Sequence, residues 1–121
     1  MIFRVPAGAR VFFGAPAQPM EQALIRSIAE AVATVPGIIE AHLPQCYVPE
    51  VMQKPAQVLV LVLSVSCHLE TSVAAVAGRL SDVLPTSRYL DLLPIVPNSS
   101  LLSTIRGAGC KIFDRSNAVV F

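Results

Sequence analysis

Charge is scarce in this sequence. Charged side chains make up 14% of its 121 residues, whereas an ordinary soluble domain carries about 25%. The nine Lys and Arg residues are spread along the chain and almost balance the eight Asp and Glu residues, which gives a net charge of +1. No basic stripe with interleaved aromatic residues occurs, so the pattern excludes binding of nucleic acid through its phosphates. Asp82, Asp91 and Asp114 belong to different predicted elements, so no acid pair marks a catalytic site.

Cysteine is also sparse, and long apolar runs are missing. Cys46, Cys67 and Cys110 form an odd set, which fits reduced thiols in a cytoplasm better than a secreted disulfide framework. The apolar stretch before Ala15 and Pro16 is too short for a signal peptide. No uncharged apolar run reaches the roughly 20 residues of a membrane span. We therefore expect a cytoplasmic protein that does not enter a membrane.

Apolar side chains are abundant and make up 54% of the chain. A chain of 121 residues fits a single domain, and such a domain can bury roughly two-thirds of its unfolded surface. The surplus of apolar residues then needs a second place of burial, and large exposed apolar patches usually mark interfaces. We expect self-association, as a homodimer, or contact with an unidentified protein partner.

The segment from Gln57 to Ser66 gives the strongest structural signal. Seven of its ten residues are Val or Leu, and no charge, Pro or Gly interrupts them. Successive side chains of a strand point to opposite faces, so this strand is apolar on both faces. We expect it at the centre of a sheet that is covered on both sides.

Turn residues and hydrophobic periodicity predict the other elements. The predicted strands are 1–5, 9–14, 38–48, 58–66, 89–96 and 110–113, and the predicted helices run from about 18 to 35, 67 to 84 and 101 to 106. Residues 116–121 are left open between a frayed end and an added edge strand. From 9 to 96 the order is the βαββαβ of a ferredoxin-like two-layer sandwich, an α+β fold with a mostly antiparallel sheet. Two helices on one face would leave the other face open as a dimer surface.

The predicted strand 38–48 has two unlike faces. Ile39, Ala41 and Leu43 point one way, while Glu40 and His42 point the other way, toward solvent or an interface. Pro44 has no N–H to donate to a neighbouring strand and therefore marks a bulge or an edge. Gly78 inside the second helix predicts close packing against a strand, because glycine costs up to about 1 kcal/mol there relative to alanine.

In this arrangement the chain resembles the C-terminal domain of the enhanced serine sensitivity (SseB) protein family. The resemblance covers most of residues 9–113 and rests on the segments 11–17 (VFFGAPA), 35–43 (VPGIIEAHL), 84–85 (LP), 89–94 (YLDLLP) and 109–113 (GCKIF). These segments mark strand ends and helix ends, and none of them is catalytic. The resemblance implies a cytoplasmic bacterial protein that acts as an interaction module. In that family the domain usually follows a separate N-terminal domain.

Two residue pairs could carry chemistry. His42 and Cys46 share a face of their strand, but four residues of extended chain separate them by about 13 Å, too far for two ligands of one zinc ion. Cys67 and His68 lie where a strand opens into a helix, a place where the pKa of a thiol can be lowered. Adjacent side chains diverge, so we expect a small buried Cys67 beside an exposed His68. We assign no catalytic, cofactor-binding or metal-binding residue.

Three functions stay open at this point. The first is a non-catalytic interaction or regulatory module, which the apolar surplus and the family resemblance favour. The second is a small-molecule sensor that holds its ligand at a dimer seam, near Gly14 or in the loop 49–55. The third is an enzyme that uses Cys67 and His68. The segment after Gly14 lacks the glycines and the lysine of a phosphate-binding loop, so it does not favour a nucleotide.

Overall fold

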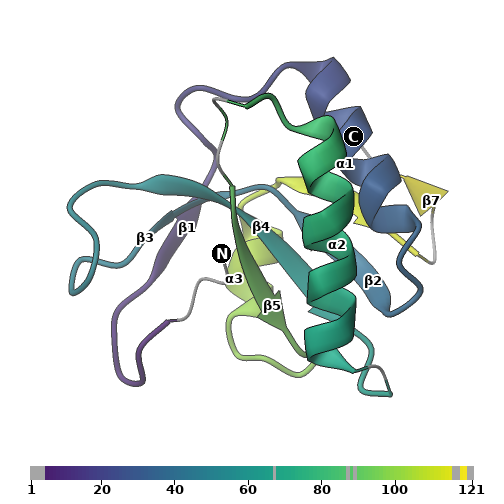
Figure 1. Cartoon of the computed structure of the whole chain (residues 1–121). Helices are drawn as coiled ribbons and strands as arrows, with labels where there is room; N and C mark the ends of the chain where they lie inside the picture. Colours follow the sequence, from purple (N-terminus) through teal and green to yellow (C-terminus); the bar gives the residue numbers. More distant parts are fainter. Residues whose placement is uncertain (1–4, 67, 87, 89, 116–117, 120–121) are drawn as a thin grey trace.

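The computed structural model describes residues 5–66, 68–86, 88, 90–115 and 118–119 (Figure 1). Within these residues the chain forms an α+β structure with three helices and a curled, mostly antiparallel sheet. The strands are β1 (Phe12–Gly14), β2 (Ile38–His42), β3 (Gln45–Tyr47), β4 (Ala56–Leu63), β5 (Asp91–Ile95), β6 (Lys111–Asp114) and β7 (Ala118–Val119). The helices are α1 (Gln22–Ala33), α2 (Leu69–Val83) and α3 (Leu102–Gly107).

The strand order is β1-β3-β4-β2-β6-β7, and β5 pairs with β4. β4 is the central strand, because β2 and then β3 follow it antiparallel on one side while β5 runs parallel to it on the other. The predicted ferredoxin-like order is not confirmed. The parallel strands β4 and β5 lie directly side by side, whereas a ferredoxin-like order would place the first strand between them. Among the described strands, β1 pairs with β3 and not with β4 or β5.

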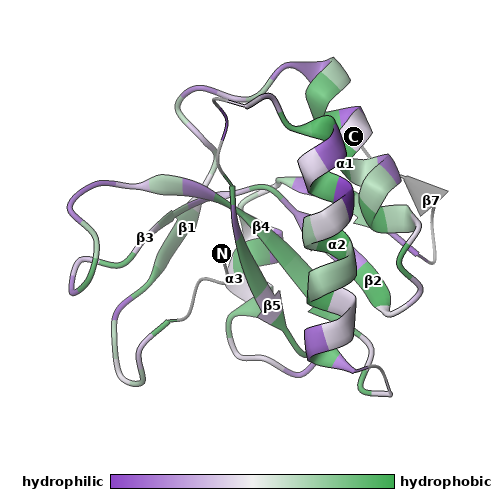
Figure 2. Ribbon diagram, viewed as in Figure 1, coloured by the Kyte–Doolittle hydropathy of each residue, from purple (hydrophilic) through white to green (hydrophobic). Residues whose placement is uncertain are grey.

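Both faces of β4 are covered, as its composition predicts. Its leucines (Leu59, Leu61 and Leu63) pack into a cluster with α1 and α2, and its valines (Val58, Val60 and Val62) pack into a second cluster with α3. Figure 2 shows β4 and β5 as largely hydrophobic ribbons between these layers. The side chains alternate between Val and Leu along β4, so each face receives one residue type.

The expectation of an open sheet face is wrong for this part of the sheet. Leu102 and Ile105 of α3 are buried against the valine face of β4. Val5, Val11 and Phe13, from the N-terminal segment and β1, pack against the same cluster. The surface that we expected a second copy to cover is therefore closed within the chain itself.

Leu43 and Pro44 separate β2 from β3, and the two strands continue along β4 as one line. The register with β4 does not shift between His42↔Val60 and Gln45↔Gln57, so the bulge offered for Pro44 is not confirmed. An irregularity in this pairing lies instead between Ile38 and Glu40. Because of it, Ile39 packs with the α3 cluster, whereas Ala41 and Leu43 belong to the α1 and α2 cluster. The prediction that these three residues share one face is therefore wrong for Ile39.

The helices differ from prediction in detail. α1 begins at Gln22, so Pro19 lies before the helix and not in its first turn. Gly78 of α2 is exposed, and a Cβ atom built on it would contact nothing within 4 Å, so close packing does not explain this glycine. β7 adds an edge strand next to β6 within the segment that we left open. Tyr89 and the predicted strand 1–5, apart from Val5, lie outside the described residues.

Arg115, directly after β6, caps the C-terminal end of α1. Its guanidinium donates hydrogen bonds to the carbonyl oxygens of Ala33 (3.1 Å), Val35 (2.8 Å) and Ile38 (2.8 and 3.1 Å). α1 has no basic residue in its own last turn. Arg115 therefore supplies the cation and the donors that the carbonyl end of a helix favours. Among the described residues, no helix has the length and apolar character needed to cross a membrane.

Candidate functional site

Glu40, His42 and Arg106 form a network in which the first two side chains are buried and Arg106 of α3 is half exposed. His42 Nε2 donates a hydrogen bond to Glu40 Oε1 over 2.7 Å, and His42 is fully buried. Arg106 of α3 holds both oxygens of the same carboxylate, with Nε to Oε1 at 3.0 Å and Nη2 to Oε2 at 2.7 Å. The expectation that Glu40 and His42 face solvent or an interface is wrong, because both are buried within the chain. The network fastens α3 to the sheet.

The geometry explains the protonation of both residues. The hydrogen bonds from Arg106 hold the pKa of Glu40 below its ordinary value, against the opposing effect of burial. Burial lowers the pKa of His42, although the neighbouring carboxylate works in the opposite direction. Nδ1 of His42 is buried without a hydrogen-bond partner. A proton on Nδ1 would be an unsatisfied buried donor, which favours the neutral ring with its hydrogen on Nε2.

We expect this histidine to make the protein less stable in mild acid. The unfolded chain protonates His42 near its ordinary pKa of 6.5, while the folded chain protonates it only at lower pH. The free energy of unfolding should therefore fall as the pH drops below about 6.5, by up to about 1.4 kcal/mol per pH unit. Urea melts from pH 7.5 to 5 measure this slope.

Two variants identify the source of that slope. His42→Gln keeps a side-chain donor but removes the titration, so its slope over the same pH range should be flatter. His68→Gln is the matched control, since His68 is exposed at the start of α2 and its loss should leave the wild-type slope intact. An unchanged slope in His42→Gln would contradict the assignment.

The structure places Cys46 and His42, the first candidate pair, in different surroundings. Cys46 is fully buried in the α3 cluster, and burial raises the pKa of its thiol to about 11. His42, the other member of this candidate pair, forms a hydrogen bond with Glu40. Cys67 lies outside the described residues. Across the part of the chain that the structure describes, no group of three or more His, Cys, Asp or Glu side chains could hold a metal ion.

A crevice lies where the sheet divides, and it is the candidate functional site. β2 and β3 follow one another along β4. On their other side β6 pairs antiparallel with β2 and β1 pairs antiparallel with β3, so β6 and β1 lie end to end. Gly14 at the end of β1 pairs with Gln45, and Lys111 at the start of β6 pairs with His42. Leu43 and Pro44 occupy the interval between those two partners. The line formed by β1 and β6 therefore has a gap opposite Leu43 and Pro44.

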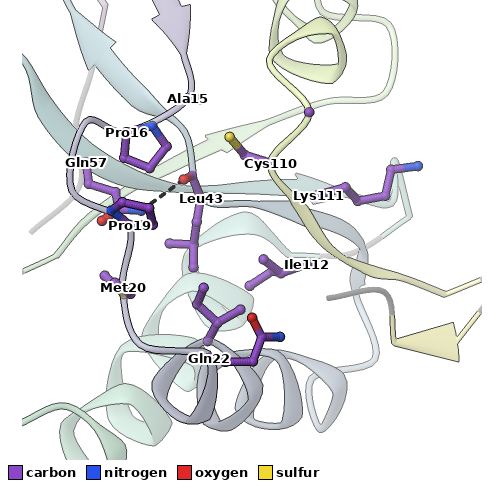
Figure 3. Close-up of a pocket in the computed structure, with 12 residues that line it drawn as sticks. Ala15, Pro16, Pro19, Met20, Gln22, Leu43, Gln57, Cys110, Lys111 and Ile112 are labelled. Carbon is purple, nitrogen blue, oxygen red and sulfur yellow. Dashed lines mark hydrogen bonds between the residues drawn. The ribbon is translucent and has the colours of Figure 1, made fainter.

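The crevice has a volume of about 280 Å³ and a mostly apolar wall (Figure 3). The segment between β1 and α1, the first residues of α1, the connection between β2 and β3 and the start of β6 each contribute to it. Its lining residues are Ala15, Pro16, Pro19, Met20, Gln22, Ile25, Leu43, Gln57, Gly109, Cys110, Lys111 and Ile112.

Backbone and side-chain hydrogen bonds hold the polar groups of the crevice in place. Leu43 N donates to the carbonyl oxygen of Cys110 over 2.9 Å, and Leu43 O accepts from Gln57 Nε2 over 3.0 Å. The Cys110 thiol lies 3.4 Å from the carbonyl oxygen of Ala108, and burial raises its pKa. Gly109, before Cys110, has a φ of +71°, which favours glycine at the turn into β6.

A second hollow, of about 430 Å³, lies beside Glu40 and has a charged wall. Lys111 Nζ and Asp114 Oδ2 form an ion pair there at 3.1 Å. Arg106 and Arg115 complete the charged lining, but both guanidinium groups already bond the carboxylate of Glu40 or backbone carbonyls. Charge in this hollow is used to hold elements together.

Sequence reasoning did not predict the residues of the crevice. The sensor alternative placed a ligand at a dimer seam near Gly14 or in the loop 49–55, whereas the crevice lies within one chain, begins at Ala15 and has no lining residue from that loop. The sequence did not indicate that Gln57, Leu43 and Ile112 line a cavity. An apolar strand pattern predicts that a residue is buried, but it does not predict which cavity the residue borders. Arg106 was likewise missed as the partner of Glu40, since 66 positions separate the two residues.

Comparisons of the chain with models of protein families, with curated proteins and with solved structures found no match.

Proposed function

We propose that this protein is a non-catalytic binding module with an interaction or regulatory role. The observation that supports the proposal is that the ionisable side chains at the two candidate sites are already paired or lie at the edge of the crevice. His42 and Arg106 both bond the buried carboxylate of Glu40, and the crevice is lined by neutral side chains apart from Lys111 at its edge. Catalysis by acid, base or nucleophile needs such groups to be free and accessible to a substrate.

The resemblance to the C-terminal domain of the enhanced serine sensitivity family is part of the same proposal. It adds a cytoplasmic location in a bacterium and a role in contacts with another protein. The segment 11–17, on which the resemblance partly rests, leads from β1 into the wall of the crevice. The break in the sheet at Pro44 follows another of these segments, 35–43.

Self-association is the finer part of this proposal. Its support is now a set of separate exposed side chains and no longer an open sheet face. Phe12 of β1 is 53% exposed, and Val65, Leu69 and Val96 lie in segments at the carboxyl ends of β4 and β5. Light scattering on the purified chain separates a dimer from a monomer.

The test of the non-catalytic proposal is the reactivity of the three thiols. We expect iodoacetamide at pH 7 to label Cys46 and Cys110 at least about tenfold more slowly than free glutathione, because the thiolate is the reactive form and burial disfavours it. We expect Cys67 to react no faster than glutathione. Peptide mass spectrometry after timed quenching gives the rate at each cysteine.

Unfolding in guanidinium chloride is the control for this measurement. Denaturation should bring all three rates to the value of a free thiol, because it removes burial. Rapid labelling of Cys67 alone in the native protein would contradict the proposal and favour the enzyme that uses Cys67 and His68.

A further inference from the structure

We infer that the crevice at the split in the sheet binds a small, uncharged, largely apolar molecule that carries one hydrogen-bonding group of the amide or hydroxyl type. The inference rests on the proposed binding function, and it names the class of ligand that the crevice would bind. It is carried by the origin of the crevice, by the charge of its wall and by one fixed carboxamide.

The topology produces the crevice and leaves it open. After β1 the chain turns to α1, which lies on the leucine face of β4, whereas the chain reaches β6 from α3 on the valine face. The two connections therefore leave the gap on opposite faces of the sheet. Ligands of open α/β sheets bind where neighbouring connections diverge in this way, because no segment of chain closes the space between them. Here the gap lies between the carboxyl end of β1 and the amino end of β6, so the likeness is limited to connections that leave it on opposite faces.

The wall of the crevice carries little free charge. Pro16, Met20, Ile25 and Ile112 give it an apolar surface (Figure 3). The one ammonium group at its edge, on Lys111, points away from the centre in Figure 3 and pairs with Asp114 at 3.1 Å. A charged ligand would lose its hydration here without gaining a counter-ion, so an uncharged ligand is favoured.

The polar groups of the crevice are neutral and one of them is fixed. Gln57 uses an N–H to bond the carbonyl oxygen of Leu43, which sets the orientation of its carboxamide. The carbonyl oxygen of Gln57 remains an acceptor on that oriented group. Gln22 lies across the crevice on the first turn of α1, and the thiol of Cys110 stays protonated because burial raises its pKa. A few fixed polar groups in an apolar wall are what set the orientation of a small ligand.

Size limits the ligand further. The volume of about 280 Å³ lies just below the roughly 300–1,000 Å³ found for small-molecule sites. This space suits a compact molecule rather than a nucleotide or a long lipid chain.

Methyl and side-chain amide NMR spectra of the full chain test the inference with four probes at millimolar concentration. Hexanamide and cyclohexanol have the inferred chemistry, while hexanoate and hexylamine have similar size but a charge. We expect the uncharged probes to shift the methyl signals of Ile25 and Ile112 and the side-chain amide of Gln57 in a saturable manner. The charged probes should bind at least about tenfold more weakly, because they find no counter-ion.

A blocking variant and its control confirm the location. Ala15→Trp places a large ring at the exposed rim of the crevice and should abolish the shifts caused by hexanamide. Ala74→Trp makes the same change on the exposed side of α2, away from the crevice, and should leave binding unchanged. Near-identical circular dichroism spectra verify that both variants fold.

Three results would overturn the inference: no saturable shift with either uncharged probe, equal affinity for charged and uncharged probes, or shifts confined to residues outside the crevice. None of them would alter the rates of thiol labelling, so failure here is distinguishable from failure of the proposed function.

Discussion

Replacing Leu61 with Asp is expected to unfold this protein, and replacing Val60 with Asp should do the same from the opposite face of β4. Both side chains are fully buried. A carboxylate at either position would be removed from water without a partner, which costs more than the about 5–15 kcal/mol that stabilises an ordinary domain. Leu61 faces α1 and α2, whereas Val60 faces α3, so the pair tests both layers.

Far-UV circular dichroism and urea melts of the purified variants measure the effect. Ala56→Asp is the matched control, because Ala56 lies on the same strand but is exposed at its start. It should cost less than about 1 kcal/mol. A Val60→Asp variant that stays soluble and melts cooperatively would mean that the valine face is open, as the sequence alone led us to expect.

The central strand could be predicted from sequence because its signal is local. Ten consecutive residues without charge or breaker admit few alternatives, and the Val and Leu alternation fixes which residues share a face. The bulge or edge expected at Pro44 was less secure, because proline lacks a donor wherever it stands but the pairing with β4 keeps one register across it. The two faces of β4 follow from neighbours in the chain alone.

The cover of the valine face could not be predicted, because it is assembled from weak and distant segments. α3 has only six residues, and its apolar positions Leu102 and Ile105 give too short a pattern to show which face they meet. Val5 and Val11 lie in an irregular segment without any helical or strand period. Two helices in the expected layer therefore suggested an open face, although a third helix was available to close it.

The crevice forms where the end of β1 lies beside the start of β6, and no local sequence pattern predicts that these two strand ends are close together. Gly14 and Cys110 are 96 positions apart, yet the sulfur of Cys110 lies 4.0 Å from the carbonyl oxygen of Gly14. Which strands lie one behind the other follows from the pairing of β1 with β3 and of β6 with β2. A single-sequence pattern predicts strands but not these pairings, so it could indicate Gly14 as a strand end and nothing about the cavity beyond it.

Glu40→Gln is expected to produce the largest loss of stability among conservative changes in the charged groups. The variant keeps the shape of the side chain but removes the charge that two donors of Arg106 and one of His42 share. Breaking a buried charged network by removing one partner costs roughly 3–5 kcal/mol. Because the Arg106 side chain is 52% exposed and can regain water, we expect the lower end, about 3 kcal/mol and a fall in Tm of roughly 10 °C.

Glu50→Gln is the control for that change, since it makes the same substitution in an ion pair with one arginine at the surface. Glu50 pairs with Arg10 at 3.2 Å, with side chains 39% and 72% exposed. Exposed pairs contribute less than about 1 kcal/mol, so Tm should barely move.

The pH dependence of stability separates the effect of the Glu40 charge from the effect of its shape. The pKa of Glu40 is lowered in the folded state. The ionised carboxylate therefore contributes its full stabilisation above the ordinary pKa of 4.5, and this contribution declines as the pH falls through the lowered pKa. The difference between wild type and Glu40→Gln should shrink in acid, and a difference that stayed constant from pH 7 to 3 would mean that packing, and not the ionised network, holds α3 on the sheet.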